Sequence, residues 1–141
     1  MTTVTRGAFM AAAQASLAAA LPGREVMRGI QEPADLGDAA LQQGVWTLVA
    51  ASASGWPRIL TREGRFGTLS FAAVFYGRVA EGESALALEQ LEEAAELELL
   101  DWVNTTKPEP LDAVYPLRAT YSQGREFPYG WVVMEMEAMY V

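Results

Sequence analysis

Residues 122–141 read SQGREFPYGWVVMEMEAMYV, and this segment carries the most information about the fold. From Val132 on, the even positions are apolar, whereas Glu135 and Glu137 occupy odd positions. This period of two indicates a strand with one buried face. The glycines and the proline before it indicate a turn, in which Gly130 is expected to take a positive φ angle. We therefore expect a hairpin that ends in a core strand.

Three segments upstream also have strand patterns. Residues 66–79 alternate, and residues 111–121 alternate with Tyr115 and Leu117 on the apolar face. Residues 45–51 are apolar on both faces, which is typical of a central strand. A turn is expected at 52–55, and a short strand at 25–30.

Two helices are expected, each with a capping residue. Thr5 can cap a helix over residues 5–20, and Ser84 can cap a helix that runs to about residue 103. Apolar residues recur in both at spacings of three and four; in the second helix they are Leu88, Leu91, Ala95, Leu99 and Trp102. Residues 33–43 are expected to be a loop or one helical turn.

These elements predict the fold class. The chain has 141 residues, which suits one domain over residues 1–141. Most connections are too short for helical crossovers, so most strand pairs should be antiparallel. We predict an α+β fold with a mixed, mostly antiparallel sheet packed by two helices, a two-layer single domain.

The composition excludes several kinds of chemistry. The chain has no cysteine and no histidine, which excludes disulfides, Ser-His-Asp catalysis and most zinc sites. We expect no enzyme activity, no metal and no cofactor. A carboxylate pair remains open as an alternative, and replacing Glu63 and Glu126 would test it. The longest apolar runs are too short to span a membrane.

The charge is unevenly distributed. Residues 1–80 have a net charge of +2 and residues 81–141 a net charge of −10, which gives −8 in total. Specific nucleic-acid binding is not expected, because it needs clustered basic residues. The acidic segment 83–101 is best interpreted as a solvated helix face, with a metal site or a surface for a basic partner as alternatives.

Two groups of residues are candidates for a subunit or tail interface. The first is a basic segment with Trp56, Arg58, Arg62 and Arg65, since Arg and Trp are enriched at interfaces. It could meet the acidic helix of a neighbouring subunit.

The second group lies at the hairpin turn and comprises Arg125, Phe127, Tyr129 and Trp131. It is either a partner-binding aromatic knob or a turn with core aromatics. The other face of the last strand is apolar at both ends, at Trp131, Val133, Met139 and Val141, and a neighbouring subunit is expected to cover it.

The chain resembles the tail terminator proteins of long-tailed bacteriophages over nearly its whole length. The resemblance lies in short, non-catalytic motifs and their order: the Ala-rich helix before Leu21-Pro22-Gly23-Arg24, Arg28-Gly29 with Pro33 and Gly44-Val45, Gly67-Thr68-Leu69 with Tyr76-Gly77, an acidic helix with Glu89 and Glu96, and Ser122-Gln123 with Pro128-Tyr129-Gly130-Trp131.

The resemblance implies a virion protein of the tail or neck, present in the host cytoplasm during assembly. Its partners would be itself, as a homohexameric ring, the tail tube protein and the head–tail connector protein. DNA would pass through the ring, and no catalytic residue is implied. Two alternatives remain: a head–tail connector or neck completion protein, and a non-viral small binding module. The binding module would need a pocket lined by Trp46, Phe71 and Phe75.

Overall fold

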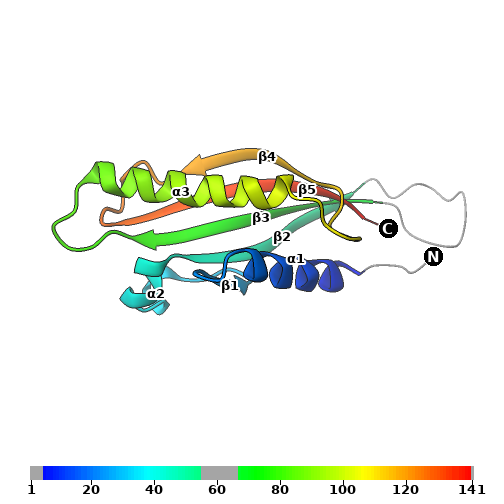
Figure 1. Ribbon diagram of the computed structural model, residues 1–141, viewed down its shortest axis with the longest axis horizontal. Helices are drawn as coiled ribbons and strands as arrows, with labels where there is room; N and C mark the ends of the chain where they lie inside the picture. Colours follow the sequence, from blue (N-terminus) through cyan, green and yellow to red (C-terminus); the bar gives the residue numbers. More distant parts are fainter. Residues whose placement is uncertain (1–4, 55–66, 141) are drawn as a thin grey trace, which may run out of the picture.

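The computed structural model describes residues 5–54 and 67–140 (Figure 1). Its elements are α1 (Arg6–Ala20), β1 (Glu25–Arg28), the 3-10 helix η1 (Pro33–Asp35), α2 (Asp38–Gln43), β2 (Val45–Ser54), β3 (Gly67–Arg78), α3 (Ala85–Asn104), β4 (Val114–Tyr121) and β5 (Tyr129–Tyr140).

The strands of the described residues form one sheet in the order β1-β2-β3-β5-β4. β1 pairs parallel with β2, and the remaining pairs are antiparallel. The parallel pair is possible because η1 and α2 lie in a long connection between its two strands. The chain therefore forms a single small α+β domain with a mixed, mostly antiparallel sheet, as the sequence predicts.

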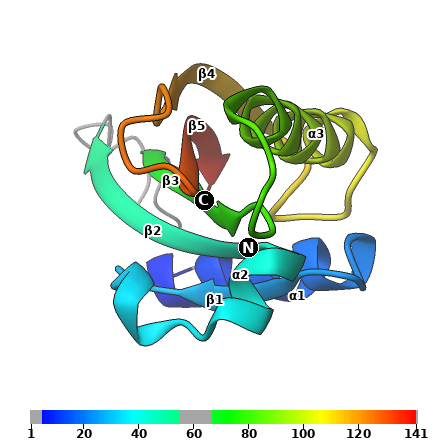
Figure 2. The ribbon, with the colours of Figure 1, turned by 90° about the vertical axis from the view of Figure 1, so that its left-hand side faces the viewer.

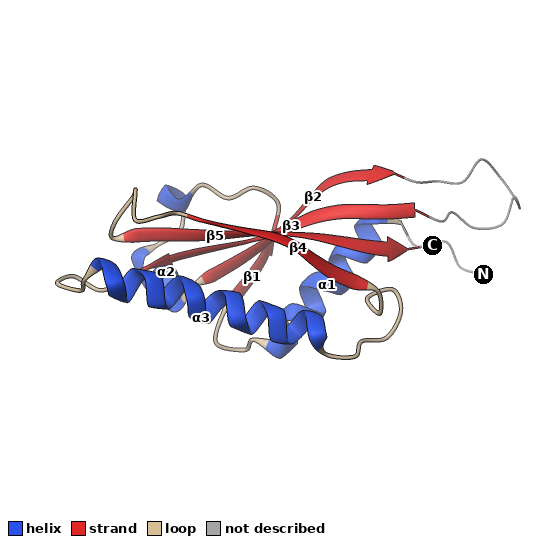
Figure 3. Cartoon of the chain, turned by 90° about the horizontal axis from the view of Figure 1, so that it is seen from above, coloured by secondary structure: helices blue, strands red, loops and turns tan. Residues whose placement is uncertain are grey.

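The two long helices pack on the same face of this sheet (Figure 3). Phe9 and Leu17 of α1 share one buried core with Leu99 and Trp102 of α3. The indole Nε1 of Trp102 also donates a hydrogen bond to Ser16 Oγ of α1, at 3.0 Å. The two helices and the sheet thus make two layers.

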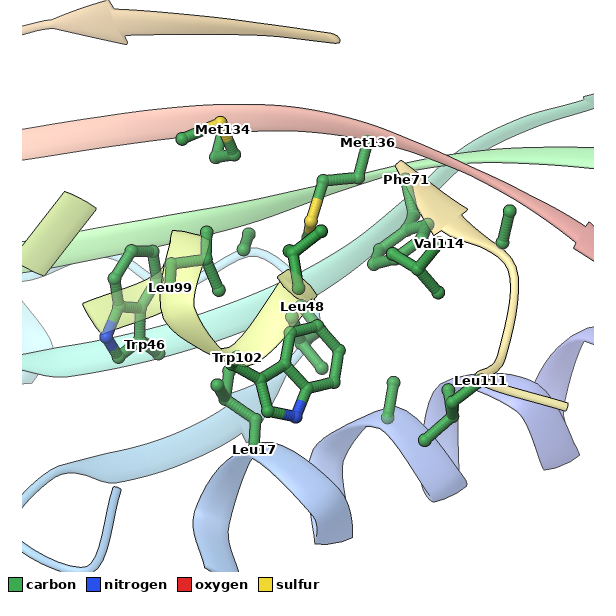
Figure 4. Close-up of a cluster of buried hydrophobic side chains, with 14 of the residues drawn as sticks. Leu17, Trp46, Leu48, Phe71, Leu99, Trp102, Leu111, Val114, Met134 and Met136 are labelled. Atoms are coloured by element: carbon green, nitrogen blue, oxygen red, sulfur yellow. The ribbon is translucent and has the colours of Figure 1, made fainter. Parts of the chain in front are cut away.

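Aromatic side chains fill much of the space between these layers. The ring of Phe9 meets that of Phe71 edge to face, with centroids 5.5 Å apart, and the rings of Trp46 and Phe75 lie 5.3 Å apart. Figure 4 shows Trp102 of α3 beside Leu17 of α1, with Met136 of β5 above them. Burial of such large apolar side chains is the main stabilising contribution to the fold.

β3 and β5 form the long central pair of the sheet. Their register runs from Gly67 opposite Tyr140 to Arg78 opposite Tyr129. The even residues of β5 are buried, as their alternation predicts; they are Val132, Met134, Met136 and Ala138.

Both ends of α3 are closed by side chains. Ser84 Oγ accepts a hydrogen bond from the backbone N–H of Ala87 at 3.2 Å, which confirms the predicted cap. At the other end, the ammonium group of Lys107 donates to the carbonyls of Trp102, Val103 and Thr105 at 2.7, 3.1 and 2.7 Å. Lys107 therefore satisfies carbonyls that the end of a helix leaves without intrahelical partners.

Two strand predictions were wrong in detail. Residues 52–54 of the expected turn at 52–55 belong instead to β2, which continues to Ser54 after a bulge between Ala50 and Ser52. In β4, Tyr115 and Leu117 are exposed, not buried. A bulge between Pro116 and Arg118 shifts the register there, so a strict period of two does not hold along this strand.

The sheet face opposite α1 and α3, called here the outer face, is covered at one end by other described residues. Thr47 on this face is fully buried, and its hydroxyl donates to the carbonyl of Gly29. Leu41 of α2 is buried as well. In Figure 2, β1 and α2 lie below β2, whereas α3 and β4 lie above it. The segment between β1 and β2 thus covers one end of the outer face.

Candidate interaction surfaces

The turn between β4 and β5 is held by backbone hydrogen bonds. The N–H groups of Arg125, Phe127 and Tyr129 donate to the carbonyls three residues before them. Gln123 and Gly124 have positive φ angles of 60° and 71°. The glycine of this turn that needs a left-handed conformation is therefore Gly124.

Gly130 is not a positive-φ residue, and its expected role was wrong. It lies within β5 opposite Gly77, directly beneath α3. A Cβ atom there would lie 2.7 Å from Leu88 Cδ1 and 3.1 Å from Glu92 Oε1. Glycine is needed at this position because α3 approaches the strand closely.

The structure brings together only part of the predicted aromatic group. Tyr129 and Trp131 line one pocket at the covered end of the outer face. Phe127 is 44% exposed. Arg125 is exposed and donates to Gln123 Oε1 within the turn. The group is therefore neither one exposed knob nor a set of core aromatics.

The pocket with Tyr129 and Trp131, called the outer pocket, has a volume of about 280 Å³. Its remaining wall comes from Tyr76, from Glu126 and from the segment with Pro33, Leu36 and Leu41. Burial raises the pKa of the Tyr76 hydroxyl, and the carboxylate of Glu32 raises it further. With its pKa raised, the phenol is a neutral hydrogen-bonding group, and the pocket wall also has the carboxylates of Asp38 and Glu126.

An ion pair joins the wall of the outer pocket to the sheet. Arg78 Nη1 lies 2.6 Å from Asp38 Oδ2, and the guanidinium stacks over the ring of Tyr129 at 5.4 Å. Arg78 Nε is buried, with no hydrogen-bond partner among the described residues. These contacts fix α2 to the end of β3, a link that the sequence does not reveal because its two residues are forty positions apart.

Four of the predicted interface residues lie outside the described residues. They are Trp56, Arg58, Arg62 and Arg65, and Glu63 lies in the same segment. The segment that carries them joins the end of β2 to the start of β3.

The acidic helix is only partly a solvated face. Glu89 and Glu93 of α3 are exposed, as predicted, but Glu92 is 5% exposed. The hydroxyl Oγ of Ser122 lies 2.9 and 3.1 Å from the two carboxylate oxygens of Glu92. Burial raises the pKa of Glu92, against the hydrogen bonds from Ser122, which lower it. Glu92 therefore ties α3 to the end of β4.

A groove runs along α3 beside the hydrogen bonds between Glu92 and Ser122, and we call it the α3 groove. Its volume is about 700 Å³. Its apolar lining includes Leu86, Leu97 and Leu100, and its acidic lining comprises Glu89, Glu92, Glu93 and Glu96. Tyr121 closes one side, with its hydroxyl 2.7 Å from Glu96 Oε1, a hydrogen bond that raises the pKa of the tyrosine. Exposed leucines beside carboxylates suit a partner that is both apolar and basic.

Sequence reasoning missed this groove for a physical reason. The apolar stripe of α3 predicts which side packs on the sheet, but Leu86 and Leu97 lie off that stripe and are 60% and 54% exposed. Leucines outside the buried stripe are the one signal that could have indicated the groove. The partner residue Tyr121 comes from another element, so only the fold shows that it lies nearby.

Neither a metal site nor a membrane span is found in the described part of the chain. No group of three or more His, Cys, Asp or Glu residues there could hold a metal ion. No helix among the same residues is both long and apolar enough to cross a membrane.

No protein-family model matches the chain, and no curated protein matches its sequence.

Proposed function

We propose that this chain is a structural phage virion protein, a tail terminator that acts through self-association. In this function, copies of the chain form a ring that caps the tail tube and joins it to the head connector. The motif order from Leu21-Pro22 to Gly130-Trp131 supports the family. The α3 groove is the structural observation that carries the proposal.

The α3 groove favours a protein partner over a small substrate. Leu86 and Leu97 in its lining are 60% and 54% exposed and do not belong to the core, and exposed apolar surface of this kind marks interaction sites. Glu92, the most buried carboxylate of the groove, is already hydrogen-bonded to Ser122. The groove therefore offers contact area and negative charge, which are the requirements of an assembly interface.

The unpaired edge of β4 supports the same function. β4 is the last strand of the sheet, and Tyr115 and Leu117 on it are more than half exposed. A strand edge with exposed apolar side chains is a site for association with another chain. Met139 of β5 is also 61% exposed, so apolar surface extends to the neighbouring strand.

The alternative of a small binding module loses its predicted site. Trp46, Phe71 and Phe75 lie in the core, and they line neither the outer pocket nor the α3 groove. The outer pocket is smaller than most ligand sites, which measure roughly 300–1,000 Å³. A neck completion protein remains the second candidate, because the same self-association would serve a ring at either position.

Negative-stain electron microscopy of the purified full chain at high concentration tests the ring. We expect rings with sixfold symmetry and a central hole. The matched functional test adds the chain to polymerising tail tube protein of the phage that encodes it. We expect tubes that stop growing and carry extra density at one end. Chains that neither form rings nor stop tube growth would contradict the proposal.

A further inference from the structure

The α3 groove and the basic segment 56–66 have complementary chemistry. Glu89, Glu93 and Glu96 line the groove beside exposed leucines. The sequence of residues 56–66, WPRILTREGRF, has three arginines and one carboxylate, with four large apolar residues between them. Opposite charges set the register of an interface, and apolar contacts provide most of its stability.

The start of α3 lies at one end of the sheet, and the strand ends that residues 55–66 connect, Ser54 of β2 and Gly67 of β3, lie at the other (Figure 1). The hydrogen bond between Glu92 and Ser122 lies near Trp131, because the carbonyl of Trp131 accepts a hydrogen bond from the N–H of Ser122. Segment 55–66 is attached where Gly67 pairs with Tyr140. Residues 131 and 140 of β5 are separated by about 30 Å, at a rise of roughly 3.3 Å per residue.

The segment cannot reach this end of the groove in its own chain. It has twelve residues and is anchored at both ends, so its middle reaches at most about 20 Å from its anchors, at roughly 3.3–3.6 Å per residue. The end of the groove with Leu86, Glu89 and Glu93 is therefore open to the segment of a different copy and not to that of its own chain. A contact between opposite ends of two identical molecules is heterologous, and such contacts generate rings when their rotation closes.

We propose that the α3 groove receives residues 56–66 of a second copy of this chain. The contact is head to tail, with the arginines of one copy against Glu89 and Glu93 of the next and apolar side chains on Leu97. This inference rests on the proposed self-assembly and identifies the two surfaces that make it.

A charge-swap experiment with full-length chains tests this contact. One variant carries Arg58→Glu and Arg62→Glu, and the other carries Glu89→Arg and Glu93→Arg. Each variant alone opposes like charges at the contact, so we expect self-association to weaken by at least roughly tenfold. In an equimolar mixture every head-to-tail contact between the two variants again joins opposite charges. We therefore expect the mixture to assemble, measured by sedimentation velocity.

Two further variants separate the contact from general effects. The variant with Glu109→Arg and Asp112→Arg changes the net charge by the same amount as the variant with Glu89→Arg and Glu93→Arg. Its two residues are exposed and lie outside the groove, so it should associate like the wild type. Leu97→Gln removes apolar contact without changing charge and should weaken association. Because Leu97 is 54% exposed, this variant should retain the wild-type circular dichroism spectrum.

The outcomes distinguish this inference from the proposed function. Wild-type assembly that both charge variants retain would overturn the head-to-tail contact and leave the ring proposal standing. A mixture that stays dissociated, or a wild type that stays monomeric at every concentration, would also overturn the contact. In the last case the tube-capping experiment still decides the function, because it does not require rings of the isolated chain.

Discussion

Glu92 shows how a single residue departs from its helical pattern. Its neighbours Glu89 and Glu93 are exposed, but Glu92 points toward β5 and is buried near Gly130. Only a glycine there leaves room for the carboxylate and Leu88. The buried group is tolerated because Ser122 supplies hydrogen bonds, since a buried carboxylate without partners would be costly.

The raised pKa of Glu92 predicts how stability changes with pH. The folded chain holds this proton more tightly than the unfolded chain, in which the ordinary value of 4.5 applies. The contribution to stability is therefore fully present below pH 4.5 and is lost as the pH rises through the folded pKa. Glu92→Gln should lose this component, so the free energy of unfolding of the variant, relative to wild type, should increase with pH.

Urea denaturation at a series of pH values measures this difference. Ser122→Ala is the informative comparison, because it removes a hydrogen bond that lowers the pKa of Glu92. It should enlarge the loss of stability with rising pH. A constant difference between Glu92→Gln and wild type at all pH values would show that Glu92 does not titrate differently in the folded chain.

At the scale of elements, the ends of α3 depend on residues just outside it. Ser84 caps the start by a local hydrogen bond that the sequence reveals. The other end depends on Lys107, which is 8% exposed and lies 4.8 Å from the ring centroid of Trp102. Burial lowers the pKa of Lys107, and the carbonyls that it contacts compensate for the lost water.

Lys107→Met should destabilise the protein while preserving the apolar part of the side chain. The variant removes the Lys107 donor from the carbonyls of Val103 and Trp102, of which Trp102 keeps the N–H of Thr105, at a cost of about 1–3 kcal/mol in unfolding free energy. Thr105→Ala is the matched control, because Thr105 Oγ1 donates to Asp101 O at an exposed position. The control should cost about 0.5 kcal/mol or less, since water replaces the donor. Equal losses in thermal unfolding would rule out a special role for Lys107.

At the scale of the whole molecule, charge is separated along the chain. The α3 groove has the carboxylates of Glu89, Glu92, Glu93 and Glu96, and the sequence of residues 56–66 has three arginines. Association through these surfaces should weaken with salt, because the screening length falls from about 10 Å at 0.1 M to about 3 Å at 1 M.

Sedimentation velocity at constant protein concentration and increasing sodium chloride measures this dependence. We expect the assembled fraction to fall between low and high salt. The equimolar charge-swapped mixture should respond in the same way, since its contacts are also ionic. Assembly that strengthens with salt would indicate an interface dominated by apolar contacts, such as the exposed edge of β4.

Local periodicity was sufficient for the elements whose packing is uniform along their length. β3 and β5 alternate without interruption, and α1 and α3 have regular stripes, so their positions and buried faces were predicted. β4 was predicted less well, because its bulge reverses which residues face the core. A bulge depends on how the partner strand pairs, and that information is not local.

The sequence by itself determined the α+β class, the caps of both long helices, the core residues of β5 and the separation of charge, because each follows from neighbouring residue types. Only the tertiary structure decided the strand order, the burial of Glu92 against Ser122, the close approach of α3 to Gly130 and the α3 groove. Each of these joins residues that are far apart in the chain. Their proximity is a result of packing, which no local pattern specifies.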